Sequence, residues 1–372
     1  MKTDLHLLKN EKCCGCGVCS AVCPQNIIEM KPDNYGFLYP HIVSQNFCVA
    51  CHLCMDYCPS QHLEEIQIPT HNVAVFAGFT SNPYELQKSA SGGIASSISQ
   101  QIIKDGGVVY GVVYSSDFSK AMYRKADTSE ALEAFRGSKY IQADKLNIYS
   151  DVLEALKCGK KVLFIGLPCD VAGLKTYLGK DFPSLFTIEL ICYGVTSPKV
   201  AEYYLSYLEN KFHKKVVDFS VRYKKGGKWT PPYLYAMFED GFSYLHPFYD
   251  TDYGIAFSLL SRPSCYNCVY KGNKRVADLT IGDYWGCTEE DAFWNSGGVS
   301  SVFVHTEKGN ILVECLSGVK LFGTDYAHAS AANPMIENSL PSSPLRNIFS
   351  RLFVIFGLKI ACFPVKIMKK LL

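Results

Sequence analysis

The sequence predicts an α+β protein in which an α/β core follows a small cysteine-rich module and precedes a C-terminal amphipathic helix. Three observations lead to this prediction. Two cysteine runs of the same spacing lie between residues 13 and 59. Apolar runs with strand character alternate with segments of helical period over most of the chain after residue 71. Residues 346–372 place basic and apolar side chains on opposite sides of a helix.

Length and composition indicate a globular chain of several domains. With 372 residues, 48% of them hydrophobic and 19% charged, the chain can bury a core, which excludes wholesale disorder. The net charge of +2 gives no reason to expect nucleic-acid binding. We expect four segments: the cysteine-rich module at 1–70, two parts of the core at 71–155 and 156–330, and a linker with the tail at 331–372.

The two cysteine runs read Cys13-x2-Cys16-x2-Cys19-x3-Cys23-Pro24 and Cys48-x2-Cys51-x2-Cys54-x3-Cys58-Pro59. This is the spacing of bacterial ferredoxins with two 4Fe-4S clusters, where the fourth cysteine of each run ligates the other cluster. A zinc module is the alternative, but zinc needs four ligands and eight are present. The expected ligand sets are therefore Cys13, Cys16, Cys19 and Cys58 for one cluster, and Cys48, Cys51, Cys54 and Cys23 for the other.

The remaining cysteines and the chain start bear on the compartment. The spacing argues for reduced thiolates rather than for disulfides among the 17 cysteines, hence a reducing compartment. The first residues lack an apolar stretch typical of signal peptides, and no apolar run reaches the length of a membrane span. We expect a cytoplasmic protein. Cys14 lies outside the ligand register and is predicted to have no partner.

The first part of the core contains a glycine-rich turn that suits an anionic ligand. After a predicted strand at 72–78, Ser91-Gly92-Gly93 opens a helix with apolar residues at Ile94, Ile98 and Ile102. Such a turn exposes backbone N–H groups at a positive helix end, which suits a phosphate or a flavin edge, although an ordinary helix cap is the alternative.

A second candidate for the anionic ligand lies further along. A strand is predicted at 108–114 and a helix at 129–135. Arg136-Gly137-Ser138-Lys139-Tyr140 then places two cations in a loop, which suits anionic groups but is equally consistent with a plain loop.

The second part of the core brings a third set of cysteines. A strand at 161–166 leads to Cys169 and a helix at 171–178, and a strand at 186–191 leads to Cys192. Because parallel strands place their carboxyl ends at one edge, we expect these two thiols to meet there. Together with Cys265-x2-Cys268 they form four thiols suited to zinc or to an iron–sulfur cluster, unless they are buried structural cysteines. The neighbouring ferredoxin module favours a third 4Fe-4S cluster.

Two basic segments lie in the second half of the chain. Lys224-Lys225-Gly226-Gly227-Lys228 is predicted to be a solvated hairpin tip, with docking of an acidic partner as an alternative. The tail at 346–372 is predicted to be a helix interrupted at Pro364. Such a basic amphipathic helix is consistent with binding at an anionic membrane surface, which would place the protein on the inner face of a membrane, or with docking on the protein's own core.

From about residue 75 to 320 the chain resembles the beta-subunit family of coenzyme F420 hydrogenases and dehydrogenases. The resemblance rests on these segments: Ser91-Gly92-Gly93, Gly137-Ser138-Lys139-Tyr140, Leu167-Pro168-Cys169-Asp170, Ile191-Cys192-Tyr193-Gly194, Cys265-x2-Cys268 and Ala277-Asp278-x3-Gly282-Asp283. It implies FAD and a cluster held by the Pro-Cys, Cys-Tyr-Gly and CxxC cysteines. The family's frequent Pro-Cys-Gln is Pro-Cys-Asp here, because Asp170 replaces the glutamine.

The resemblance also implies a role and candidate cofactor contacts. It implies an iron–sulfur flavoprotein oxidoreductase that exchanges electrons with a ferredoxin-like donor or acceptor, and a link to surface-polysaccharide metabolism, with no substrate specified. An electron-transfer subunit without its own substrate, serving a partner enzyme, is the alternative. A zinc-stapled binding protein is a third possibility. The predicted FAD contacts are Ser91, Gly92, Gly93, Arg136, Ser138, Lys139, Tyr140 and Asp283.

Overall fold

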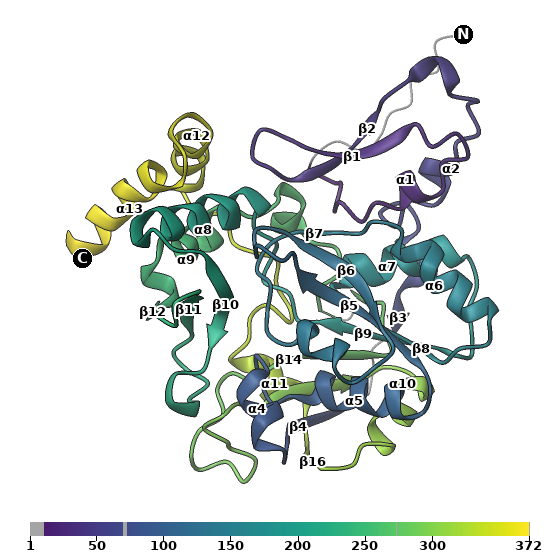
Figure 1. The fold of residues 1–372 in the computed structure, drawn as a ribbon. Coiled ribbons are helices and arrows are strands. Elements are labelled where there is room, and N and C mark those ends of the chain that lie inside the picture. Colours follow the sequence, from purple (N-terminus) through teal and green to yellow (C-terminus); the bar gives the residue numbers. More distant parts are fainter. Residues whose placement is uncertain (1–10, 70–72, 273, 372) are drawn as a thin grey trace.

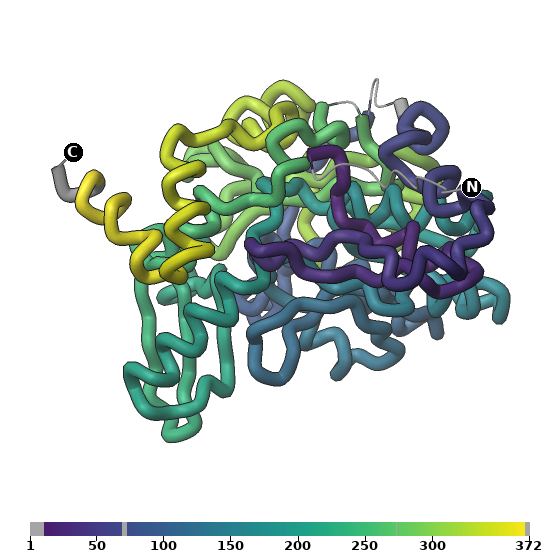
Figure 2. The backbone as a smooth tube through the Cα atoms, turned by 90° about the horizontal axis from the view of Figure 1, so that it is seen from above, coloured from purple at the N-terminus to yellow at the C-terminus, as the bar shows by residue number. Residues whose placement is uncertain are grey.

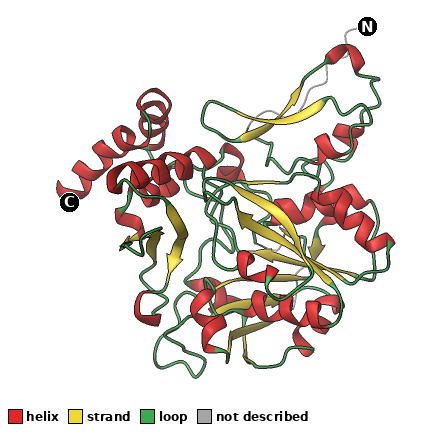
Figure 3. Cartoon of the chain, in the orientation of Figure 1, coloured by secondary structure: helices red, strands yellow, loops and turns green. Residues whose placement is uncertain are grey.

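The computed structural model describes residues 11–69, 73–272 and 274–371, and consists of an N-terminal module, a large mixed sheet with helices on both faces, and a side unit with the tail (Figures 1 and 3). In the module, β1 (Ile28–Pro32) and β2 (Leu38–Ile42) form an antiparallel hairpin. Each cysteine run contains one short helix, α1 (Val18–Ala21) or α2 (Leu53–Asp56). The residues before these helices, Gly17 and His52, both have positive φ, so the two halves of the module share one turn geometry.

The core sheet has nine strands in the order β16-β4-β15-β14-β9-β8-β5-β6-β7. Neighbours in the central group β14-β9-β8-β5 are parallel, and so are β6 and β7, whereas the other neighbours are antiparallel. The strands are β4 (Ala74–Thr80), β5 (Val108–Tyr114), β6 (Ala121–Ala126), β7 (Ala143–Asp144), β8 (Val162–Gly166), β9 (Leu185–Leu190), β14 (Leu279–Asp283), β15 (Ser300–Val304) and β16 (Val319–Thr324).

Helices cover both faces of this sheet because its strands carry apolar side chains on both sides. On one face, Ile94, Ile98 and Ile102 of α5 pack with Val109 and Leu163. On the other face, α6 and α7 pack against Tyr110 and Phe164. The helices around the sheet are α4 (Pro83–Lys88), α5 (Ile94–Lys104), α6 (Ile148–Lys157), α7 (Pro168–Leu178), α10 (Glu307–Glu314) and α11 (Tyr326–Ala331).

A side unit carries the C-terminal tail (Figure 2). Its sheet is antiparallel in the order β10-β11-β12. The last two helices contact α9, and α13 also contacts α8. The elements of this unit are α8 (Pro198–Phe212), β10 (Val216–Tyr223), β11 (Tyr233–Phe238), β12 (Ser243–Pro247), α9 (Asp252–Leu259), α12 (Arg346–Phe356) and α13 (Leu358–Leu371). A short α3 (Leu63–Ile66) and the pair β3 (Ile68–Pro69) and β13 (Lys274–Arg275) link the module to the core.

The predicted strands and the predicted α5 are present, and two local predictions are wrong. The segment predicted as a helix at 129–135 is a short 3-10 helix, Ala131–Phe135. The tail is interrupted at Gly357, whose φ of 79° suits glycine, and Pro364 lies inside α13. None of the helices described here is long and apolar enough to cross a membrane.

Candidate functional site

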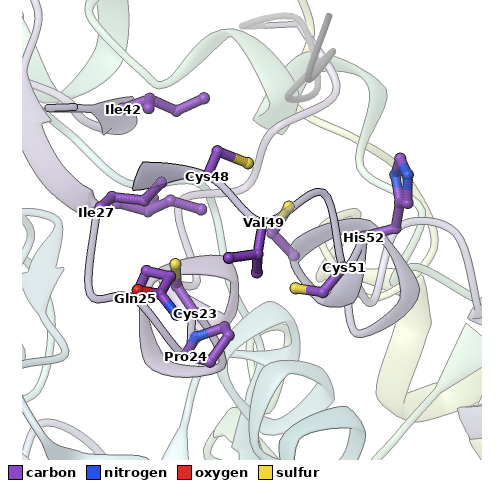
Figure 4. A pocket seen from close by; sticks show the side chains of 11 residues that line it. Cys23, Pro24, Gln25, Ile27, Ile42, Cys48, Val49, Cys51 and His52 are labelled. Carbon is purple, nitrogen blue, oxygen red and sulfur yellow. The ribbon is translucent and has the colours of Figure 1, made fainter. Parts of the chain in front are cut away.

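The module contains two pockets lined by cysteines. Cys23, Cys48, Cys51 and Cys54 line one of them, which we call the distal site, together with Pro24, Ile27, Ile28, Ile42 and Val49 (Figure 4). Cys13, Cys16, Cys19 and Cys58 line the other, the proximal site, together with Cys14. Each run thus sends its fourth cysteine to the other run's pocket, which is the grouping that the spacing predicted, while ligation itself remains a prediction.

The thiols of the proximal site are in an environment that disfavours the free thiolate. Burial raises the pKa of Cys58 to about 11 and raises the pKa values of Cys13 and Cys19. A buried thiol of this kind loses its proton when a metal centre supplies compensating positive charge. The donor set therefore fits iron–sulfur ligation better than a role for free thiols.

The third set of cysteines gathers where the module meets the core. Cys169 lies in the first turn of α7, Cys192 follows β9, and Cys265 lies in a 3-10 helix, Pro263–Asn267, just before Cys268. The thiols of Cys192, Cys265 and Cys268 interact electrostatically, and burial raises the pKa of Cys192 to about 11 and of Cys265 to about 12.

Cys14 joins this set to the proximal site, so the prediction that it has no partner is wrong. Its thiol hydrogen-bonds with those of Cys16 and Cys169. The thiol of Cys268 also interacts with Cys14. The sequence signal for this role is weak, because only the position of Cys14 next to Cys13 could have indicated it. Proximal and third-set thiols are therefore in direct contact across the boundary between module and core.

Arg262 holds the module on the core. Its side chain is fully buried and donates from Nε to the Cys13 carbonyl oxygen at 2.8 Å and from one terminal nitrogen to the Leu38 carbonyl oxygen at 3.0 Å. The guanidinium lies 3.9 Å from the centre of the Tyr39 ring. A side chain at Gly15 would overlap the Arg262 guanidinium, so the close approach of the cysteine run requires glycine there.

A buried ion pair lies next to the Cys14–Cys169 contact. Lys145 Nζ is 2.8 Å from Asp170 Oδ1, and Tyr123 donates its hydroxyl to Asp170 Oδ2 at 2.8 Å. Tyr149 donates its hydroxyl to the Cys16 carbonyl oxygen at 2.6 Å. The side chain at the family's glutamine position therefore forms a polar network with residues of the core.

The glycine-rich turn is placed by the sheet edge. The Ser91 hydroxyl donates to the Val299 carbonyl oxygen at 2.9 Å, and Thr80 N donates to the Gly92 carbonyl oxygen at 2.7 Å. A Cβ on Gly92 would lie 2.3 Å from the Gly78 carbonyl oxygen. Gly93, with φ of 83°, ends the turn as the residue before α5. The turn therefore opens a helix of eleven residues, as expected of a site for an anion.

Arg136 and Lys139 differ in how available their charges are. Arg136 forms buried ion pairs with Glu85 and Glu133, so its charge is already compensated, which argues against the predicted cofactor contact. Lys139 Nζ donates to the carbonyl oxygens of Ala134 and Arg136 at 2.9 and 2.8 Å. Burial lowers the pKa of Lys139 to about 7.

Asp283 and Tyr140 meet around an arginine that no sequence pattern indicated. Arg222 donates to Asp283 Oδ2 at 2.9 Å and to the Ala90 carbonyl oxygen at 3.1 Å, and it interacts with the Tyr140 hydroxyl. Ser138 hydrogen-bonds with Tyr140, whose ring stacks on Phe257 at 4.5 Å. The turn at 91–93, the loop at 138–140 and Asp283 are therefore close together, and Arg222 links them.

The basic turn at 224–228 is only partly solvated. Lys225 and Lys228 are exposed, but Lys224 is buried and donates to the Ser91 carbonyl oxygen at 2.8 Å and to that of Leu86. Burial lowers the pKa of Lys224 to about 7. The prediction of a wholly solvated tip is wrong because β10 carries this lysine under the glycine-rich turn.

Comparison with known proteins assigns two segments of the chain. Residues 159–321 match the family described as the C terminus of the beta subunit of coenzyme F420 hydrogenase/dehydrogenase, and residues 12–62 match a 4Fe-4S dicluster domain. The family match covers the second half of the resemblance predicted for residues 75–320. None of the curated proteins matches the chain.

One solved structure is similar over most of the chain. It is a chain from the F420-reducing NiFe hydrogenase complex of Methanosarcina barkeri, studied by xenon derivatization. The alignment covers 82% of this chain and 94% of that chain at 17% sequence identity, with a TM-score of 0.47. From the two family matches, the protein carries a 4Fe-4S dicluster domain at residues 12–62 and belongs, through residues 159–321, to the coenzyme F420 hydrogenase/dehydrogenase beta-subunit family.

Proposed function

We propose that this protein is an iron–sulfur flavoprotein oxidoreductase that passes electrons between a ferredoxin-like protein, its distal, proximal and third 4Fe-4S sites, FAD and an organic substrate. The contact of Cys14 with both Cys16 and Cys169 carries the proposal, because it makes the proximal site and the third set neighbours. A chain of sites then leads from the outer end of the module to the core. Flow in the reverse direction uses the same residues.

The third set fits a cluster better than zinc. A tetrahedral zinc site needs sulfur atoms about 2.3 Å from one ion. Among the described residues, no group of three or more His, Cys, Asp or Glu side chains is arranged to hold a single metal ion. A cubane is larger and separates its four ligands more widely. We therefore assign Cys169, Cys192, Cys265 and Cys268 to a third 4Fe-4S cluster.

The residues near the glycine-rich turn fit a flavin with an anionic group. FAD would supply the exchange between single electrons and electron pairs. Gly92 and Gly93 leave room for close approach of a ligand to the start of α5, and Lys139 offers a nearby amine. Arg222 holds Asp283 and Tyr140 at the same place. Of the predicted contacts, Arg136 is the one whose ion pairs compete with this role.

Metal and flavin analysis of anaerobically purified protein tests the proposal. We expect about twelve irons with matching acid-labile sulfide, one FAD and no zinc per chain. Cys169→Ala should reduce iron to about eight and leave the dicluster domain loaded, while the exposed Cys315→Ala should lose none. About eight irons plus zinc would assign the third set to a structural site. Eight irons with neither zinc nor added-back FAD would refute the oxidoreductase.

The alternative is an electron-transfer subunit that serves a partner enzyme. The observation that favours it is the exposed apolar surface beside the distal site, where Phe47 and Val49 are 67% and 59% exposed. Under this alternative the purified chain binds clusters, yet its flavin or clusters are reoxidised only when the partner is present. Turnover of an organic substrate by the chain alone would reject it.

The tail supports a further proposal, attachment to an anionic membrane surface. Phe349, Phe353 and Cys362 are buried on the protein's own core, whereas other apolar side chains face outward. The exposed ones are Ile348, Val354, Ile355, Phe356, Ile360, Phe363, Ile367 and Met368. Such a surface suits an enzyme acting on a lipid-linked or surface-glycan intermediate.

Membrane attachment is tested without disturbing the docked face. Ile355→Ser with Phe363→Ser changes two exposed residues, and the charged contacts of the tail, such as Lys366 with Asp252 at 2.5 Å, remain. We expect the natural chain to float with anionic liposomes at low salt and the double variant to lose flotation. The absence of flotation by the natural chain would end the proposal.

A further inference from the structure

We propose that the buried Lys145–Asp170 pair sets the reduction potentials of the two iron–sulfur sites beside it, the proximal site and the third site. Lys145 favours the reduced clusters and Asp170 opposes it. The statement about the third site rests on the proposed function, whereas the statement about the proximal site rests only on the dicluster domain.

Lys145 is fixed between the two sites. Its side chain is buried, and Nζ contacts Asp170 Oδ1 at 2.8 Å and the Ala143 carbonyl oxygen at 3.0 Å. The aliphatic part packs on Gly17, where a Cβ would lie 3.5 Å from Lys145 Cγ. Gly17 lies between two proximal cysteines, and the lysine interacts electrostatically with both Cys16 and Cys169. A single cation thus faces one thiol of each site.

Asp170 is fixed with equal firmness on the core side. It follows Cys169 directly, lies within the first turn of α7, and its Oδ1 is 4.0 Å from the Cys169 sulfur. Its second oxygen accepts the Tyr123 hydroxyl at 2.8 Å. The Tyr123 ring stacks on Phe164 with 5.1 Å between centres, and a Cβ on Gly166 would meet its hydroxyl. The strands β6 and β8 therefore fix the carboxylate.

The electrostatic consequence follows from what reduction does to a cluster. A cluster with four thiolate ligands becomes more negative by one charge when it accepts an electron, and its potential depends on nearby charges and burial. A buried ammonium stabilises the reduced form more than the oxidised form, and a carboxylate does the opposite. Because both groups are shielded from water, their effects are larger than those of surface charges.

The distal site provides an internal reference. The two cysteines with which Lys145 interacts belong to the proximal site and to the third set. Changes at Lys145 or Asp170 should therefore move the potentials of these two sites and leave that of the distal site in place. A change in overall fold or in solvent access would move all three.

Potentiometric titration of the anaerobically purified full chain, followed by EPR, tests the proposal. Lys145→Met should lower the potential of the proximal cluster and of the third cluster, and Asp170→Asn should raise both. Lys145→Arg, which keeps the charge, should stay near the natural value. The matched control is Lys161→Met, because Lys161 also pairs with an aspartate, Asp105, at 2.8 Å and lies over a ring, but on the surface.

Shifts of the two single variants in the same direction, or no shift beyond that of Lys161→Met, would overturn the proposal. If Lys145→Met loses iron, the sign of the shift in Asp170→Asn decides the question. If the protein contains only the two clusters of the dicluster domain, the proposed function fails, yet the proximal cluster must still respond to Lys145. The two failures are therefore distinguishable.

Discussion

Replacing Arg262 by methionine tests how the iron–sulfur module is held on the core. Methionine keeps much of the apolar bulk of the arginine stem but removes its charge and its donors. The structure shows three hydrogen bonds from this guanidinium to oxygen atoms, those of the Cys13 and Leu38 carbonyls and of the Gln142 side chain, at 2.8, 3.0 and 3.2 Å.

The magnitude follows from these contacts. Hydrogen bonds from a charged donor contribute about 1.5 kcal/mol each at the low end of their range, so three of them contribute about 4 to 5 kcal/mol. The Tyr39 contact at 3.9 Å adds to this sum. Because a methionine recovers some packing, we expect a loss of about 4 kcal/mol in the docking of the module. With a urea dependence of about 2 kcal/mol per molar, its midpoint falls by about 2 M.

Two probes separate the module from the core in this assay. All three tryptophans, Trp229, Trp285 and Trp294, lie outside the module, whereas the visible absorbance of the dicluster domain reports on the module. In anaerobic urea titrations the natural chain should lose both signals together. Arg262→Met should lose the cluster absorbance first.

The control is Arg124→Met, because Arg124 is exposed and donates a hydrogen bond to the neighbouring Tyr123 carbonyl oxygen, within its own strand. It should behave like the natural chain. Coincident transitions in Arg262→Met at an unchanged midpoint would refute the reasoning, and so would an equal effect of Arg124→Met.

Three further predictions concern the other sites. Gly92→Ala should cost about 1 to 3 kcal/mol in stability and prevent flavin retention, because its Cβ would lie 2.3 Å from the Gly78 carbonyl oxygen, whereas Gly323→Ala, with open space around it, should be neutral in urea unfolding and flavin analysis. Because Lys139 has a pKa of about 7 and a bound phosphate favours its ammonium form, FAD affinity measured by fluorescence should be highest below pH 7 and fall as the pH rises, and Lys139→Met should flatten this profile. If Cys13 and Cys58 serve one cluster, the double alanine variant should lose about four irons, as each single variant does, and a loss of eight would disprove the crossed ligation.

Local sequence signals predicted the elements of the fold well. The run of β-branched and aromatic residues at 108–114 coincides with β5, and the spacing of Ile94, Ile98 and Ile102 places them on the buried face of α5. The end of the tail's first helix was predicted at the wrong residue. A proline inside a helix removes one hydrogen bond, but the contacts of α13 with α8 and α9 hold it, and the break occurs at Gly357 instead.

Residues that act across the fold were beyond local patterns. Arg222 and Asp283 are 61 positions apart, and Cys14 and Cys169 are 155 apart, so no periodic pattern relates either pair. Lys224 resembles its exposed neighbours in a basic turn, although β10 buries it. The local sequence around Arg136 suggests a free cation because its acidic partner Glu85 comes from another helix, α4.

The sequence by itself determined which cysteines form the dicluster domain. Ligation of a compact cluster requires three thiols within a few residues, so the covalent spacing of each run carries the information. Only the tertiary structure decided the order of the sites and the charges beside them. The contact of Cys14 with Cys169 and the burial of Lys145 between the two sites depend on how the module docks, and docking is set by long-range packing and by the buried Arg262.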